Sequence, residues 1–506
     1  MRRSPLVAQP PASDAGVVFR LIDGRRSSMA TGQCIIATST QRVDTAIHES
    51  ARDEPDWRAN YIHHFREVTR LSAQQHALLI AADGLASVDQ QFRSRRHDTE
   101  LSLTEALAIP RSNYLSSWST AGGGVRRERE LVVPYQGHSL RGDQLRHLTA
   151  EWLDLGIAEP SCAAAIEAVI DNPDWLDLSD TTVVVLGAGA EIGPYQPLLR
   201  WGAHVVAVDL PDPAIWRRLI HLARTSSGSL TLPVRRPLSS DAPDEQVALH
   251  AGTDIITEAP ELTAWLTNLA GPYVLGDYVY APGSTHVRSS VAIDAIIKQL
   301  LERRSDIGLA YLATPTDAYA VPSDVVEHSR HNLAASGAFV TATQGLSGRR
   351  LYRANYPTIE STTNGLRFGI ADALVPQQGP NYALAKRIQR WRAQCARAHG
   401  AFVSINVAPA TRTRSVTRNR ILSAAYSGAH RFGLEIFEPQ TSSTVMAALL
   451  VHDMRNRSSS AHADVALDEE FDFLADGALH GGMWRAPFAP RSVLGVAVAM
   501  GMISRS

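Results

Sequence analysis

The stretch that decides the fold is residues 181–209, TTVVVLGAGAEIGPYQPLLRWGAHVVAVD. Its β-branched run over residues 182–186 is typical of a central parallel strand that is buried on both faces. A glycine-rich turn and a short helical pattern follow, and a second apolar strand ends at Asp209. This order predicts the first strand–turn–helix–strand unit of a doubly wound, parallel α/β sheet.

The turn GAGAEIG, residues 187–193, has the glycines of a Rossmann-type dinucleotide-binding domain. Gly187 permits a tight turn, Gly189 lets a pyrophosphate approach the backbone, and Gly193 lets the following helix pack close to the strand. Free N–H groups at the start of that helix attract phosphates. We therefore expect this turn to hold the cofactor, through Gly187, Gly189, Ala190, Glu191, Ile192 and Gly193.

Asp209 ends the second strand, where a carboxylate can accept hydrogen bonds from ribose hydroxyls and repel a 2′-phosphate. NAD is therefore expected rather than NADP. Asp254, which begins a strand expected over residues 254–257, is a further candidate for cofactor contact. Methyltransferases that use S-adenosylmethionine have a similar turn, but usually with an acid two places before the first glycine, where this chain has Val185. That alternative stays open, and so does a redox-silent NAD-binding scaffold or sensor.

Strand and helix patterns alternate after the turn. The expected strands span residues 204–208, 254–257, 273–275, 308–313 and 401–407, and the expected helices span residues 214–222, 290–301, 382–398 and 442–454. We predict four parts: a partly disordered arm with one short hairpin over residues 1–50, a mainly helical N-terminal domain over 51–175, a Rossmann-type domain over 176–425 with an insertion near 323–365, and a C-terminal helical segment over 426–506 that packs on it.

Lysine is rare in this chain, since Lys298 and Lys386 are the only two. Tyr382 lies four residues before Lys386, so the two side chains share one face of the expected helix. An ammonium near a phenol favours the phenolate and lowers the phenol pKa from about 10. A tyrosine of that kind can exchange a proton with an alcohol or a carbonyl near neutral pH. The pair therefore predicts an acid/base centre.

These pieces, in this order, resemble the short-chain dehydrogenase/reductase family over residues 178–420. The resemblance rests on the glycine turn, on the YALAK segment at 382–386, and on the strand and loop that lead to Pro409 and Thr411. It implies an NAD-dependent oxidoreductase that acts on an alcohol or ketone. It also implies that Tyr382 is the acid/base, that Lys386 holds the nicotinamide ribose, and that the loop contacts the cofactor.

The chain also departs from the family. The family's catalytic serine has no direct match, although Thr314 and Thr316 end the corresponding strand and offer hydroxyls in its place. After the fourth strand, Leu275-Gly276-Asp277-Tyr278 stands where the family has Asn-Asn-Ala-Gly. His286, in a loop before a helix, and Asp317, next to Thr316, are our candidates for substrate contact.

The composition is that of an ordinary globular protein, with 44% hydrophobic residues and a net charge of −2. This charge gives no reason to expect nucleic acid, so a small-molecule substrate is the expected partner. Three separated cysteines without metal-ligand spacing favour a reducing cytoplasm and no metal site. The apolar run at residues 493–503 is too short to span a bilayer, so we expect a terminal helix and no membrane contact. Homo-oligomerisation is left open.

Overall fold

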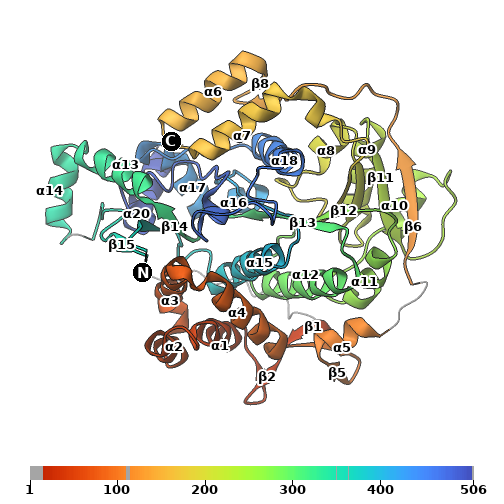
Figure 1. The fold of residues 1–506 in the computed structure, drawn as a ribbon, viewed down its shortest axis with the longest axis horizontal. Helices are drawn as coiled ribbons and strands as arrows, with labels where there is room; N and C mark the ends of the chain where they lie inside the picture. The colour runs from red at the N-terminus through yellow and green to blue at the C-terminus, as the bar shows by residue number, and fades with distance from the viewer. Residues whose placement is uncertain (1–14, 110–113, 349, 363, 504–506) are drawn as a thin grey trace.

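A seven-stranded sheet forms the centre of the molecule (Figure 1). The computed structural model describes residues 15–109, 114–348, 350–362 and 364–503. Across the sheet the strand order is β17-β13-β12-β9-β10-β11-β6. The bounds of these strands are β6 Ser116–Ala121, β9 Thr182–Leu186, β10 His204–Val208, β11 Ser229–Val234, β12 Tyr273–Asp277, β13 Ile307–Ala313 and β17 Val403–Val407.

Six of these strands are parallel, and β6 pairs antiparallel with β11 at one edge. Numbered along the chain from β9, the parallel strands lie in the order 3-2-1-4-5-6. The chain therefore moves outward from β9 to β11 and then returns to the other side of β9. The α/β class and the mostly parallel sheet that the sequence predicts are confirmed.

Helices cover both faces of the sheet (Figure 1). Within β9, Val183 and Val185 join one hydrophobic core, and Val184 and Leu186 join the other. The first core is shared with α7 Pro160–Asp171, α8 Tyr195–Arg200, α9 Pro213–Arg224, α10 Asp244–His250 and α18 Pro439–Arg455. The second is shared with α11 Ala259–Thr267, α12 Ser284–Arg303 and α15 Pro380–Ala398. This alternation is what a strand with period-two side chains and two covered faces requires.

The N-terminal region is mainly helical, as predicted, but it is not the separate helical domain that the sequence predicted. Five strands lie in the described part of residues 51–175, and one of them, β6, belongs to the large sheet. The sequence did not predict β6, because its sequence SSWSTA is mostly polar and only Trp118 is buried. Ser119 of this strand shares a hydrogen bond with Thr231 on β11. The other strands are β4 Phe92–Arg96, β5 Thr99–Leu101, β7 Val133–Tyr135 and β8 His138–Leu140.

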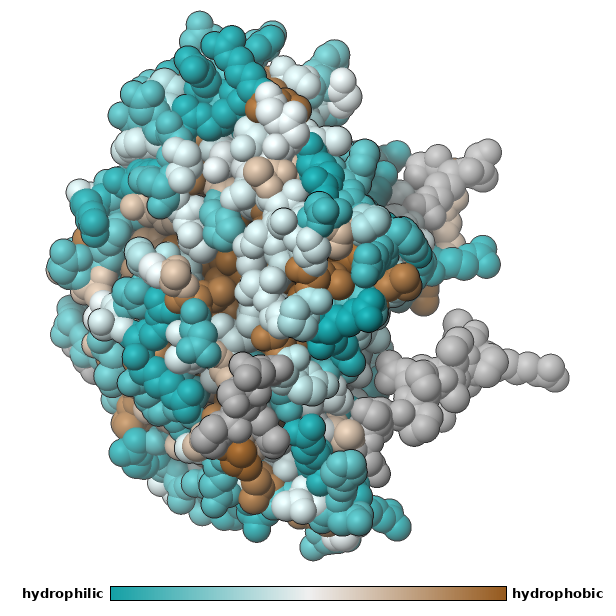
Figure 2. All heavy atoms as spheres, turned by 90° about the vertical axis from the view of Figure 1, so that its right-hand side faces the viewer, coloured by the Kyte–Doolittle hydropathy of each residue, from teal (hydrophilic) through white to brown (hydrophobic). Residues whose placement is uncertain are grey.

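The predicted disordered arm is also wrong for residues 15–50, while residues 1–14 lie outside the described part. Strand β1 pairs with β4, and the helices α1 and α4 pack together and against α15. The predicted short hairpin is present as β2–β3. The bounds here are β1 Gly16–Phe19, β2 Leu21–Ile22, β3 Arg25–Arg26, α1 Ser28–Thr40, α2 Thr45–Arg52, α3 Trp57–Leu71, a π-helical turn η1 Ser72–His76, α4 Ala77–Gln91, α5 Leu103–Ala108, α6 Gly142–Asp154 and a 3₁₀ turn η2 Pro173–Leu176. On the molecular face beside β6, hydrophilic and intermediate residues cover most of the surface (Figure 2).

The strand predicted over residues 254–257 is not formed. Asp254 accepts a hydrogen bond from the Ile256 N–H through its side chain and from the Glu258 N–H through its carbonyl, so the segment is a turn. The third parallel strand is instead β11, which the sequence analysis missed because its SLTLPV sequence has no strong β-branched run.

The predicted insertion lies within a small second sheet, in the order β14-β16-β15. Residues 323–365 separate two strands that pair with each other, β14 Ala318–Pro322 and β16 Arg367–Asp372. They are more regular than predicted, with two helices and a short strand, α13 Ser323–Ala334, α14 Ala338–Leu346 and β15 Glu360–Ser361.

The C-terminal segment is mainly helical, as predicted, and two of its helices touch through their backbones. A Cβ added to Gly428 of α17 would lie 2.2 Å from the Ala497 carbonyl oxygen of α20, and a Cβ added to Gly501 would lie 1.9 Å from that of Ala424. Only glycine allows this approach. The bounds here are α16 Arg414–Arg418, α17 Arg420–Gly428, a 3₁₀ turn η3 Ala429–Phe432, α19 Asp472–Ala475 and α20 Pro490–Ile503.

Candidate functional site

A cavity of about 1100 Å³ lies at the carboxyl ends of β9, β12, β13 and β17. In open α/β sheets, ligands bind at this edge, where the strand order reverses. Most of the site residues predicted from the sequence line this one cavity: Gly187, Gly189, Ala190, Glu191, Ile192, Asp209, Asp254, His286, Thr314, Thr316, Tyr382, Lys386, Pro409 and Thr411.

Two predicted residues do not line it. Gly193 lies behind the turn, and a Cβ there would come no closer than 3.4 Å to the Ala190 oxygen, so no close helix–strand approach requires this glycine. Asp317 is buried in an ion pair with Arg387 (3.3 Å) and Arg390 (2.7 Å). Its carboxylate is thereby compensated inside the protein, and the predicted substrate contact is wrong.

The first glycine of the turn is required by the backbone. Gly187 has φ +77°, and a Cβ there would lie 3.0 Å from the backbone of Val279, just after β12. The turn therefore rests directly on the neighbouring strand end. The helix that follows, α8, has only six residues and begins after Pro194, so its dipole is short.

Asp209 closes the other side of the turn. Its carboxylate accepts hydrogen bonds from the N–H groups of Gly189 (2.7 Å) and Leu210 (2.8 Å), and burial raises its pKa. Arg218, which the sequence analysis missed, donates to the Gly189 carbonyl at 3.0 Å and also lines the cavity. Each Asp209 oxygen has a further lone pair that could accept a ribose hydroxyl.

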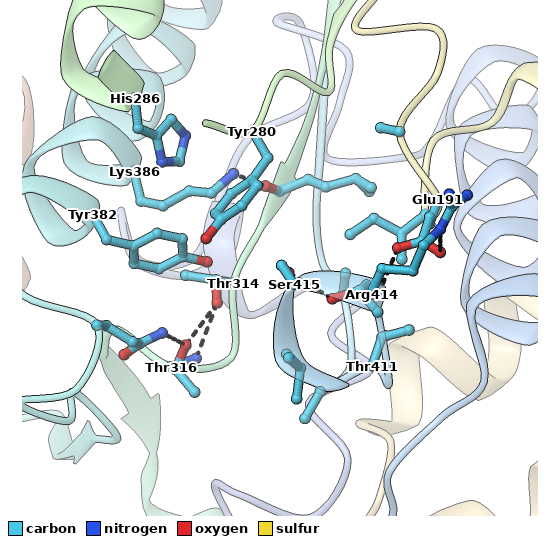
Figure 3. Close-up of a pocket in the computed structure, with 18 of the residues that line it drawn as sticks. Glu191, Tyr280, His286, Thr314, Thr316, Tyr382, Lys386, Thr411, Arg414 and Ser415 are labelled. Atoms are coloured by element: carbon cyan, nitrogen blue, oxygen red, sulfur yellow. Dashed lines mark hydrogen bonds and ion pairs between the residues drawn. The ribbon is translucent and has the colours of Figure 1, made fainter. Parts of the chain in front are cut away.

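Glu191 and Arg414 face each other across the mouth of this part of the cavity (Figure 3). The Arg414 Nε lies 2.9 Å from one carboxylate oxygen of Glu191, and the Arg414 N–H donates to the other at 2.8 Å. Nearby, the Thr411 hydroxyl donates to the Pro409 carbonyl at 2.9 Å and shares a hydrogen bond with Ser442. The glycine turn and the loop after β17 are therefore joined.

Tyr382 lies deeper, at the start of α15, with its hydroxyl turned toward Thr314 (Figure 3). Its ring contacts those of His286 and Tyr280, with ring centroids 5.5 and 6.3 Å away. Burial raises the pKa of Tyr382 well above its ordinary value, the Thr314 hydroxyl lowers it, and the phenols of Tyr280 and Tyr426 raise it again.

The lowered phenol pKa that the sequence suggested is therefore wrong for this structure, because burial outweighs any effect of the Lys386 ammonium. Lys386 donates to the Leu312 carbonyl at 3.1 Å and to the side-chain oxygen of Gln389 at 2.9 Å. Gln389 in turn donates to Asp277 at 2.8 Å. Burial lowers the pKa of Lys386 and raises that of Asp277, while each charge stabilises the other.

The two threonines at the end of β13 form a chain of hydroxyls. The oxygens of Thr314 and Thr316 lie 2.8 Å apart, and Gln378 donates its side-chain N–H to Thr316. The other Gln378 side-chain atom, the buried Oε1, has no partner among the described residues. These groups can hold a polar atom of a ligand next to Tyr382.

His286 is buried beside the same cavity at the start of α12. Burial and the nearby Lys386 charge lower its pKa to about 3, while the Val279 backbone favours the protonated ring. His286 is therefore neutral at physiological pH, and neither ring nitrogen forms a well-aligned hydrogen bond within the described residues. A neutral imidazole can both donate to and accept from a ligand.

Several site residues were missed by sequence reasoning. Tyr280, Gln378 and Tyr426 come from loops and a helix that only the tertiary fold brings to the cavity. Gln389 could have been found, because it lies three residues after Lys386 and so shares its helix face.

The chain matches no model of a known protein family and no curated protein sequence. Within the described ranges, no helix is both long and apolar enough to cross a membrane. The same ranges contain no group of three or more His, Cys, Asp or Glu side chains suited to a metal ion.

Proposed function

We propose that this protein is an NAD-dependent oxidoreductase of the short-chain type, which interconverts an alcohol and a ketone. The observation that carries the proposal is the convergence on one cavity of a glycine turn with its strand-end acid and of Thr314, Tyr382 and Lys386. Asp209 lies 105 residues before Thr314, and Thr314 lies 68 residues before Tyr382.

The topology supports this reading. The order 3-2-1-4-5-6 is that of the doubly wound Rossmann fold. In the resembled family, the hydroxyl residue ends the fifth strand, the tyrosine and lysine lie on the next helix, and a proline–threonine loop follows the sixth strand. Here Thr314 directly follows β13, α15 carries Tyr382 and Lys386, and β17 leads to Pro409 and Thr411.

The residues present fit a dinucleotide. Gly187 adopts the positive φ that favours glycine in such a turn, Asp209 offers acceptor lone pairs, and Arg218 and Arg414 supply positive charge near the turn. At the deeper end, Lys386 and His286 could hold polar groups of the nicotinamide half. Glu191 is the unfavourable element, because a carboxylate repels phosphates unless Arg414 compensates it.

A bound nicotinamide would supply or accept the hydride, which carries the two electrons. The chain's own residues handle the proton. In ketone reduction, Tyr382 donates its hydroxyl proton to the oxygen of the new alcohol while Thr314 holds that oxygen. The Tyr382 phenolate then regains a proton from solvent. Lys386, four residues along the same helix, would supply positive charge to this phenolate, and its ammonium donates to Gln389, which in turn donates to Asp277.

A redox-silent NAD-binding protein is the second candidate. The raised pKa of Tyr382 favours it, since a phenol of this kind stays protonated near neutral pH and so cannot accept the proton in alcohol oxidation. The two candidates share the cofactor and differ in turnover, so NADH consumption with ketones separates them.

A thermal-shift panel of NAD, NADP and S-adenosylmethionine tests the cofactor. We expect NAD to raise the melting temperature. At a concentration of a hundred times its Kd, NAD should add about 2.7 kcal/mol to the free energy of unfolding. Asp209→Ala should weaken NAD and reduce the discrimination against NADP. Stabilisation by S-adenosylmethionine alone would refute the proposal and favour a methyltransferase.

A further inference from the structure

The cavity has a second half that the dinucleotide would not fill, built by the C-terminal segment. Its walls are α17, η3, the segment after η3, and α20, and its lining includes Tyr426, Ala429, Phe432, Ile436, Val493 and Ala497. We name this part the apolar lobe. The total volume of about 1100 Å³ exceeds the roughly 300–1,000 Å³ of most single-ligand pockets, so there is room for a second ligand.

Charge is distributed unevenly around the cavity. Among the described lining residues from 425 to 497, none is Asp, Glu, Lys, Arg or His. The charged lining residues come from other segments, for example Glu191, Asp209 and Arg218, and the one that precedes α17 most closely is Arg418. Because a buried charge without a partner is costly, the apolar lobe disfavours a charged ligand.

The polar groups of the lobe lie at its inner end. Burial raises the pKa of the Tyr426 phenol to about 12, so this phenol stays neutral. Tyr426 also raises the pKa of Tyr382, which places the two phenols near each other. Gln378 adds a buried acceptor on the same side, beside Thr316. A ligand in the lobe would therefore meet hydrogen-bonding groups at one end and hydrocarbon elsewhere.

The lobe is also preformed. The backbone contacts of Gly428 with Ala497 and of Gly501 with Ala424 fix α17 against α20. Val493 and Ala497 pack with Phe432 in a separate small core, which supports the wall from behind. Little ordering of the protein is then needed when a ligand enters, and a ligand that is itself rigid loses less conformational entropy on binding than a flexible one.

We propose that the apolar lobe binds the hydrocarbon body of a bulky, uncharged alcohol or ketone, with its oxygen beside Tyr382 and Thr314. This substrate class rests on the proposed oxidoreductase function. It excludes sugars, hydroxy acids and other small or charged carbonyl compounds as main substrates.

Nile red, a neutral apolar fluorophore, tests the lobe without any turnover. The double variant Ala429→Leu/Ala497→Leu fills the lobe and should weaken Nile red binding about tenfold. Ala499→Leu, an exposed alanine of α20, is the matched control and should bind as the unchanged protein does. Leu494→Glu, at a half-buried lining position, is a second probe in case the double variant does not fold. Equal binding by the unchanged protein and the folded lobe variants would overturn the proposal.

Turnover then tests the substrate class. With NADH, we expect the bicyclic ketone 2-decalone to have at least tenfold higher kcat/KM than dihydroxyacetone or 3-oxooctanoate, and the lobe variants to remove this advantage. If the protein binds NADH but prefers dihydroxyacetone or 3-oxooctanoate to 2-decalone, the proposed substrate class is wrong while the proposed function stands. If no nicotinamide nucleotide binds, the proposed function fails, and the substrate class fails with it even where Nile red responds to the variants.

Discussion

Tyr382 is the residue on which the proposed chemistry depends most. Burial and neighbouring phenols keep its hydroxyl protonated at neutral pH, and the Thr314 hydroxyl forms a hydrogen bond with it. The side chain is therefore protonated, which is the state that ketone reduction requires, whereas alcohol oxidation would require the phenolate.

Replacement of Tyr382 by phenylalanine should lower kcat for ketone reduction by about 10²–10⁴-fold, the usual contribution of a positioned general acid. NADH affinity, measured by fluorescence titration, should change less than twofold, since the lost hydroxyl acts on the reacting oxygen. In the unchanged protein, reduction should stay constant through neutral pH and fall only as the pH rises through the raised Tyr382 pKa. A phenylalanine variant with normal turnover would remove Tyr382 from the mechanism.

Glu191 should weaken dinucleotide binding, because its carboxylate lies in the turn expected to meet the phosphates. Glu191→Gln removes this repulsion and frees Arg414 for the phosphates. The ion pair between Glu191 and Arg414 is partly exposed to solvent, so its loss should cost only about 0.2–1 kcal/mol of stability. We expect NAD affinity, measured by calorimetry, to rise about twofold to fivefold. Glu327→Gln, a change on the distant helix α13, is a charge-matched control that should leave the affinity unchanged. Weaker binding by Glu191→Gln would show that Glu191 holds the cofactor directly.

At the scale of elements, close helix packing depends on single glycines. Gly84 of α4 faces the ring of Trp391 on α15, and a Cβ there would lie 2.4 Å from a ring carbon. This contact joins the N-terminal helices to the helix that carries Tyr382 and Lys386.

Gly84→Ala should therefore destabilise the protein by about 1–3 kcal/mol, the usual cost of overpacking. Gly495→Ala on α20 is the matched control, since nothing lies within 4 Å of its added Cβ. Alanine is a better helix former than glycine by up to about 1 kcal/mol, so the control should be neutral or stabilising. Denaturant unfolding measures both changes, and equal stability of the two variants would contradict this account.

The same scale shows what the sequence could and could not predict. The strands β9 and β10 and the helix α15 were found because continuous apolar runs and helical spacing mark them directly. The strands β6 and β11 were missed, since their pairing depends on residues more than a hundred positions apart. At the site, most motif residues line one cavity, although Gly193 does not, whereas the ion pairs of Asp317 and the neighbours that set the Tyr382 pKa follow from tertiary packing alone.

At the scale of the whole molecule, one buried cluster joins three distant segments. Glu159, before α7, lies 2.8 Å from the Nε2 of His480 and accepts two hydrogen bonds from Arg485 at 2.9 and 2.6 Å. Arg485 also pairs with Asp324 of α13 at 2.8 Å. These partners outweigh burial and lower the pKa of Glu159 to about 2.

A carboxyl group with a lowered folded-state pKa stabilises the protein above its unfolded pKa and loses this effect as the pH falls. For Glu159 the loss should occur between about pH 4.5 and about pH 2, and it should amount to on the order of 3 kcal/mol. Glu159→Gln should lower stability at pH 7 and flatten this part of the curve of unfolding free energy against pH. An unchanged acid limb in the variant would assign acid unfolding to other carboxylates.

The place of α20 along the chain has a consequence for biosynthesis. Translation proceeds from the N-terminus, so the strands, the glycine turn and α15 all leave the ribosome before α20 does. At roughly 5–20 residues per second, several seconds pass between the emergence of β17 and that of α20. During this interval the apolar side of the cavity lacks its last wall and is open to solvent. A nascent chain that stalls before α20 is made would expose the apolar lobe. We therefore expect chaperones to bind the protein before α20 is complete.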